Sequence, residues 1–296
     1  MGTGGQTISL NSLTGGLASA PAVGDIILVY FAVGGTVDQS LSIKDSSGGA
    51  DYNLIGSELY ANSTNDANLR VAYKIVTGTP DSSFFVAPSS ASAGVVVMAE
   101  VFRGVDLANP LDVTATTATG TNTGRPDPPA ITPVTPTARI ISVSAGGGYY
   151  SNGAVLTSSD LDDFYSVLGD GATFAWDISL GVGYKSWSSG SVDPAQLGGN
   201  NTNSQSAWAS VTFALRPDLK QTLTPSLLTN SQTFFSPAVL RGTVTLTPGL
   251  LTNTQTFYAP AAIPGAVQLS PNLFTNTSAF YTPAILQDGP LLPPLL

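Results

Sequence analysis

The chain has 296 residues, a net charge of −9 and neither cysteine nor histidine. Without these two residue types it has no disulfide, no thiolate or imidazole metal ligand and no histidine-dependent catalytic triad. An acidic chain with only ten lysines and arginines is also poorly suited to nucleic acids and anionic membranes. Hydrophobic residues make up 42% of the sequence, so it can build a core and does not have a disordered composition.

No targeting or membrane-spanning segment is predicted. The first residues, MGTGGQTISL, lack the basic and apolar stretches of a signal peptide. The longest apolar run, IILVYFAV at 26–33, is much too short to cross a bilayer. We therefore expect a protein without an export signal and without membrane insertion.

Short strands rich in valine, isoleucine and aromatic residues are predicted throughout the first 219 residues. The predicted strands are 26–33, 53–60, 69–76, 83–87, 94–102, 139–146, 173–184 and 206–215. Turn-forming stretches separate them, among them TATGTNTGRPDPP at 117–129, which we expect to be a loop. No window has a sustained helical period, so the pattern predicts an all-β domain over residues 1–219, an antiparallel β-sandwich of jelly-roll type.

Two of these strands carry information about their surroundings. In the segment 69–76, Leu69 and Val71 share one face and Arg70 lies on the other, as in a strand with one apolar face. In the segment 94–102 almost every residue is apolar. This second pattern favours a strand that is buried on both faces or that faces a partner.

After Lys220 the composition changes, and Arg241 and Asp288 are the only charged residues that follow. Three copies of one phrase stand in register at intervals of 23 residues: LTPSLLTNSQTFFSP, LTPGLLTNTQTFYAP and LSPNLFTNTSAFYTP. Because nothing is inserted between the copies, each repeat is predicted to be one structural unit. We expect a second domain over 220–296, with repeats at 223–245, 246–268 and 269–291 and a Pro/Leu-rich end.

Apolar residues come in adjacent pairs within each repeat, and neighbouring side chains of a strand point to opposite faces. Both faces must therefore be covered, and burying the few large side chains of one unit offsets only part of the entropy lost on ordering it. We expect the repeats to form an intertwined, homotrimeric β-stalk. The predicted interface residues are Leu227, Leu228, Phe234, Phe235, Leu250, Leu251, Phe257, Tyr258, Leu273, Phe274, Phe280 and Tyr281. The alternative is that the units stack on one another, or lie on the first domain, within one chain.

The repeat motif, L-(T/S)-P-x-L-(L/F)-T-N-x-x-x-F-(F/Y)-x-P, resembles tandem repeats in tail, fibre and other surface proteins of tailed bacteriophages and prophages. The first domain is similar to a β-sandwich found in such virion proteins. The matching segments are VGDIILVYF (23–31), YNLIGSELY (52–60), LRVAYKIVTGTP (69–80), VFRGVDLANPLDV (101–113) and SAWASVTFALRP (206–217).

This resemblance implies a non-enzymatic structural protein at the virion surface: a trimeric fibre, spike or capsid or tail decoration, with itself and other virion proteins as partners. It implies no catalytic residue. The alternative is a receptor-binding tail adhesin that recognises a host surface polysaccharide, and an enzyme acting on surface glycan is a further rival.

Three candidate sites can be formulated from the residues. Asp160, Asp162 and Asp163, with Asp170 nearby, are either a Ca²⁺ site or a solvated loop. Glu58 and Glu100 are the only glutamates, and a pair of carboxylates is what glycoside hydrolysis requires, but nothing in the sequence indicates that the two meet. We therefore expect no enzyme activity, no metal requirement and no cofactor.

Aromatic residues near loops are the third candidate. Tyr149, Tyr150, Tyr184 and Trp187 either form a sugar-binding face or contribute to the core and to partner contacts. Trp176 and Trp208 lie on predicted strands, and we expect them in the core.

Overall fold

The structure is a computed structural model that describes residues 5–91, 94–121, 125–148, 155–169, 176–199 and 205–218. The chain divides between Leu219 and Lys220 into two units, and all described residues belong to the first. The repeats at 223–245, 246–268 and 269–291, with every interface residue predicted in them, lie outside the described residues.

Regular structure in the described part of the chain is entirely β. The strands are β1 (Gln6–Ser9), β2 (Ile26–Gly35), β3 (Leu41–Lys44), β4 (Asn53–Leu54), β5 (Leu59–Ala61), β6 (Asp66–Ile75), β7 (Ser83–Pro88), β8 (Val95–Phe102), β9 (Thr116–Thr121), β10 (Arg139–Gly147), β11 (Asp162–Gly169), β12 (Ile178–Ser186) and β13 (Ala207–Leu215). The expectation of an all-β fold with antiparallel sheets is confirmed for these residues.

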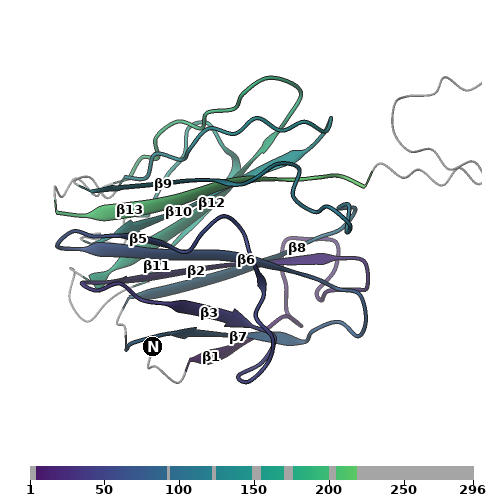
Figure 1. Cartoon of the computed structure of the whole chain (residues 1–296), viewed down its shortest axis with the longest axis horizontal. Coiled ribbons are helices and arrows are strands. Elements are labelled where there is room, and N and C mark those ends of the chain that lie inside the picture. Colours follow the sequence, from purple (N-terminus) through teal and green to yellow (C-terminus); the bar gives the residue numbers. More distant parts are fainter. Residues whose placement is uncertain are drawn as a thin grey trace, which may run out of the picture. The chain divides into compact units, whose positions relative to one another are not determined.

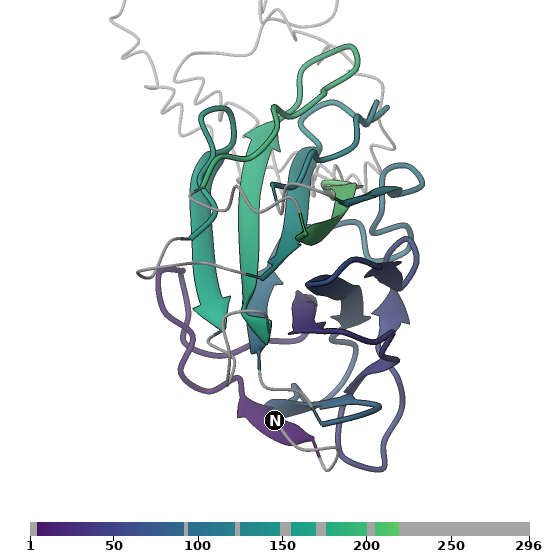
Figure 2. The ribbon, with the colours of Figure 1, turned by 90° about the vertical axis from the view of Figure 1, so that its left-hand side faces the viewer.

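The strands form three antiparallel sheets that lie in layers (Figure 1). The central sheet has the order β4-β6-β2-β8, and β5 also pairs with β6. On one side of it lies the sheet β11-β12-β10-β13-β9, and on the other the smaller sheet β1-β7-β3, as Figure 2 shows from a second direction. The central sheet is therefore covered on both faces.

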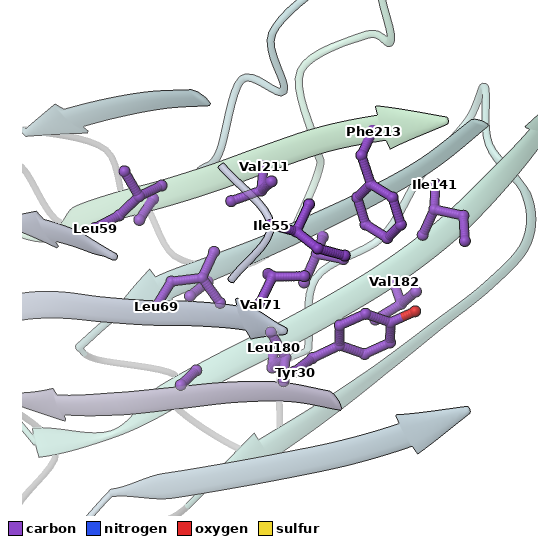
Figure 3. Close-up of a cluster of buried hydrophobic side chains, with 14 of the residues drawn as sticks. Tyr30, Ile55, Leu59, Leu69, Val71, Ile141, Leu180, Val182, Val211 and Phe213 are labelled. Carbon is purple, nitrogen blue, oxygen red and sulfur yellow. The ribbon is translucent and has the colours of Figure 1, made fainter. Parts of the chain in front are cut away.

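The second strand, β2, takes part in both hydrophobic cores through alternate side chains. Ile26, Leu28, Tyr30 and Ala32 belong to the larger core, which lies against β10, β12 and β13 (Figure 3). Ile27, Val29, Phe31 and Val33 belong to the second core, which contains residues of β3 and β7. Neighbouring side chains of a strand point to opposite faces, so every side chain of β2 from Ile26 to Val33 enters one of these two cores. This explains the uninterrupted apolar run IILVYFAV.

The predicted strand 53–60 is wrong in one respect, because it is two short strands. Gly56 has a φ of +71°, in the left-handed region that favours glycine, and the chain bends there between β4 and β5. Both short strands still pair with β6.

Two strands that the sequence did not predict, β9 and β11, lie at the edges of the larger outer sheet. β9 occupies part of the predicted loop 117–129, and β11 begins within the acidic cluster. β9 is built largely of threonine and glycine, so it lacks the apolar signal of the buried strands. β1 and β3, both short edge strands of the smallest sheet, were also missed.

Trp176 corrects a further expectation. It lies before the start of β12 at Ile178, outside any strand, and is 40% exposed rather than part of the core. The predicted strand 173–184 therefore begins too early at its described end. Trp208 does lie on β13, where it is half-buried.

The backbone N–H and C=O groups of successive residues in β8 point alternately toward β2 and away from it. Gly34 N–H donates to Gly94 O at 3.0 Å, and these residues stand directly opposite in the β2–β8 register. In an antiparallel ladder such bonded pairs recur at every second residue. Glu100 therefore bonds to β2, whereas Ala99 and Val101 direct their N–H and C=O groups away from it. The pairing of β2 with β6 is consistent with this assignment. Val76 N–H donates to Asp25 O at 2.9 Å, so the odd-numbered residues of β2 bond to β6 and the even-numbered ones to β8.

This alternation predicts a pattern of amide exchange along β8. The amides of Met98, Glu100 and Phe102 should exchange with solvent deuterium much more slowly than those of Val97, Ala99 and Val101, because only the first set is bonded to β2. Exchange resolved to single residues measures this. Equal protection of both sets would show that a further strand already covers the outer edge of β8.

Candidate functional site

Glu100 is the charged residue of β8, and its side chain lies on the face of the larger core between Met98 and Phe102. Its Oε2 accepts a hydrogen bond of 2.7 Å from Tyr30 Oη, and its Oε1 accepts one from Tyr184 Oη. Tyr30 comes from β2 and Tyr184 from β12, on the facing sheet. The carboxylate therefore ties the two larger layers together.

No described basic side chain lies within ion-pair distance of this carboxylate. Arg139 stands 5.0 Å from the centroid of the Tyr184 ring and pairs with Asp163 at 3.5 Å. Burial raises the pKa of Glu100, while the hydrogen bond from Tyr30 and the charge of Arg139 oppose the rise. Burial beside this carboxylate also raises the pKa of Tyr30 well above its ordinary value.

A cavity of about 370 Å³ lies beside the end of β8. One wall consists of residues 99–103, and the other is the loop from Leu13 to Ala20. Asp25 also lines the cavity, and Arg103 donates to both of its carboxylate oxygens at 2.8 and 3.0 Å. The hydrogen bond from Arg103 lowers the pKa of Asp25, although burial opposes it. Asp25 and Arg103 neutralise each other, so Glu100 is the carboxylate in this lining without an ion-pair partner among the described residues.

The two glutamates do not form a catalytic pair. Glu58 Oε1 accepts a hydrogen bond of 2.6 Å from Leu41 N–H, and its Oε2 pairs with Arg70 Nη1 at 2.8 Å. Arg70 lies on the face of β6 opposite Leu69 and Val71, which belong to the larger core with Glu100. Glu58 and Glu100 therefore act on opposite faces of the central sheet, and the arrangement required for glycoside hydrolysis is not formed by them.

The acidic cluster is divided between two basic side chains. Asp160 accepts a hydrogen bond from Lys185 Nζ through Oδ1 and one of 3.2 Å from Ala195 N–H through Oδ2. The bond from Lys185 lowers the pKa of Asp160. Asp163 pairs with Arg139. The carboxylates thus point to separate partners, and no cluster of three potential metal ligands occurs within the described ranges. Asp170 lies outside them.

Of the four aromatic residues considered for a sugar-binding face, the two described ones, Tyr184 and Trp187, pack in different clusters and do not form one together. Tyr184 is only 9% exposed and is held in the larger core, so this part of the prediction is wrong. Trp187 packs on a separate small cluster on the outer side of the sheet, with Ile140 and Ala214, and donates from Nε1 to Gly190 O at 2.9 Å. Tyr149 and Tyr150 lie outside the described residues.

Sequence reasoning missed the two tyrosines around Glu100. The available signal was a single glutamate in an otherwise apolar strand, because a charge at such a position needs hydrogen-bonding partners. Nothing in the spacing of Tyr30 and Tyr184, which lie far apart in the chain, indicates that they meet at this residue. The exposed ring of Tyr165, on edge strand β11, was also missed.

Comparisons with known proteins do not indicate a role for this site. No protein family, curated protein or solved structure matches the chain. In the part of the chain that the structure describes, no helix has the length and apolar character needed to cross a membrane.

Replacing Glu100 with Gln is expected to change how stability depends on pH. The raised pKa means that the folded protein binds this proton more tightly than the unfolded chain does. The stability that protonated Glu100 contributes is therefore fully present below its pKa in the unfolded chain, about 4.3. It is lost as the pH rises through the pKa of Glu100 in the folded protein. Glu100→Gln removes the titration, so its stability relative to wild type should improve from pH 4 to pH 7. Denaturant unfolding at both pH values measures this.

The control is Glu58→Gln, which removes the partner of Arg70 and should destabilise the protein near neutral pH. If Glu100→Gln instead loses stability relative to wild type as the pH rises, the Glu100 carboxylate is favoured by its surroundings and burial does not dominate them.

Proposed function

We propose that the chain is a non-enzymatic structural protein of a bacteriophage virion, a trimeric surface fibre, spike or decoration protein of the capsid or tail. In this proposal residues 1–219 form a displayed β-sandwich, and residues 220–296 form the stalk that joins three copies. The observation that carries it is the 23-residue repeat, which stands three times in strict register with paired apolar residues and almost no charge.

Two features of the described domain support this proposal. The two five-stranded sheets that pack across the larger core suit a sandwich, to which the smaller sheet adds a third layer. Several carboxylates stabilise the fold itself: Asp112, which is 4% exposed, accepts hydrogen bonds from Val134 and Thr135 and pairs with Arg216. A rigid domain with its charges engaged in this way suits a structural role.

The second candidate is an adhesin that binds a host surface polysaccharide. The observation that favours it is the ring of Tyr165, which is 62% exposed on edge strand β11, the strand that begins with Asp162 and Asp163. Aromatic rings stack on sugars, and carboxylates accept hydrogen bonds from sugar hydroxyls. A glycan array with wild type and Tyr165→Ala distinguishes an adhesin from a scaffold.

The proposed function is tested on particles of the phage or prophage that encodes the chain. Particles purified on a density gradient should contain the protein, and native mass spectrometry after gentle dissociation should release it as a species of three chains. The released species should remain a trimer in high salt, because an apolar stalk interface is not weakened by ionic screening. Recovery of the chain only from the particle-free fraction, or only as a monomer, would contradict the proposal.

A further inference from the structure

We propose that the free edge of β8 is a docking site for an extended peptide strand that carries a basic side chain. The peptide would pair with the outward backbone groups of Val97, Ala99 and Val101 and place a lysine or arginine opposite Glu100. This binding site goes beyond the structural role proposed above and does not depend on it.

The backbone of β8 provides the first part of the argument. β8 is the last strand of the central sheet, and the alternation established by the Gly34–Gly94 bond directs Ala99 and Val101 outward. Across the described ranges, no hydrogen bond reaches these outward N–H and C=O groups. β8 contains no proline, lysine or bulge, and the one charge that opposes its pairing with another strand is that of Glu100. Such an edge is the surface that binds peptides by strand addition.

The shape of the edge favours a free peptide over the edge of a second folded copy. The loop from Leu13 to Ala20 stands opposite residues 99–103 and forms the far wall of the 370 Å³ cavity. The loop is closed by a hydrogen bond of 3.0 Å from Leu13 N–H to Ser19 O, and Leu17 in it is fully exposed. A cavity of this volume suits a small ligand or short segment. A second copy would have to bring its whole sheet against this loop.

The charge of Glu100 selects the side chain of the peptide. Because Ala99 and Val101 would form the hydrogen-bonded pairs, Glu100 would stand in the intervening non-bonded pair, where opposing Cα atoms approach to about 4.5 Å and side chains share a face. Tyr30 and Tyr184 donate hydrogen bonds to Glu100 but bring no charge. A lysine or arginine opposite it supplies the missing cation, and opposite charges stabilise cross-strand pairs.

The net negative charge of the first domain also favours a peptide with a basic side chain. Residues 220–296 contain Lys220, Arg241 and Asp288 and so carry a net charge of +1, which leaves −10 in residues 1–219 for the total of −9. A cationic peptide is therefore attracted to this domain, and an anionic one is repelled.

The test uses the full chain and a fluorescein-labelled, capped heptapeptide, TVTKTVT, titrated by fluorescence anisotropy. Wild type should bind it about two- to five-fold more tightly than the peptide with glutamine in place of lysine, the ratio expected of one cross-strand ion pair. Glu100→Gln should bind both peptides equally. Ala99→Pro should bind neither, and because the Ala99 N–H points away from β2 the proline removes no bond within the sheet.

A control on the peptide avoids any dependence on protein folding. With its lysine opposite Glu100, the third and fifth peptide residues face Val101 and Ala99, so N-methylation there should abolish binding. N-methylation of the second and sixth residues, whose N–H groups point away from β8, should leave binding intact.

Three results would overturn the proposal. The first is the absence of binding when wild-type protein is added to about 1 mM over a trace of labelled peptide, a concentration at which even weak specific complexes form. The second is equal binding of both N-methylated peptides. The third is a lysine preference that survives in Glu100→Gln. If a second copy occupies the edge instead, the peptide does not bind and Ala99→Pro lowers the oligomer mass in light scattering.

Discussion

The burial of β2 on both of its faces is the constraint on which the rest of the described structure depends. β2 carries apolar side chains on both of its faces, so a sheet must cover each side of the central layer. The smaller sheet β1-β7-β3 buries Phe31, and the larger outer sheet buries Tyr30. Neither outer sheet could be removed without exposing a full row of large side chains, which places the three layers in one cooperative unit.

The same constraint explains why Glu100 is unusual. β8 pairs with β2 and shares both cores, so its side chains are apolar on both faces except at this position. The tyrosine hydroxyls satisfy the carboxylate, yet no described basic side chain pairs with it. The result is a carboxylate at an otherwise apolar sheet edge. Burying this charge lowers the stability of the fold, and the charge distinguishes this edge from an apolar one. Both oxygens of this carboxylate accept hydrogen bonds, so what it lacks among the described residues is a countercharge.

The buried strands could be predicted from the sequence because buried positions are occupied by apolar residues that favour strands. β2, β6, β8, β10 and β13 fall where valine, isoleucine and aromatic residues gather. β9 and β11 could not be found in this way, because each is held by pairing with a neighbour and presents polar residues to solvent. The contacts around Glu100 were equally hidden, since they join side chains from strands far apart in the chain. Tyr184 illustrates the limit: it ends the predicted strand 173–184, and the sequence left open whether it binds sugar or joins the core, whereas its position in β12 directs it into the core.

Nuclear Overhauser effects from the two neighbouring aromatic rings of β2 test the double-faced burial most directly. The account predicts that the Phe31 ring contacts Phe84 and Val86 of the second core, while the Tyr30 ring contacts Leu180 and Val182 of the larger one (Figure 3). Contacts from both rings to the same cluster, or a Phe31 ring without contacts to β7, would contradict it.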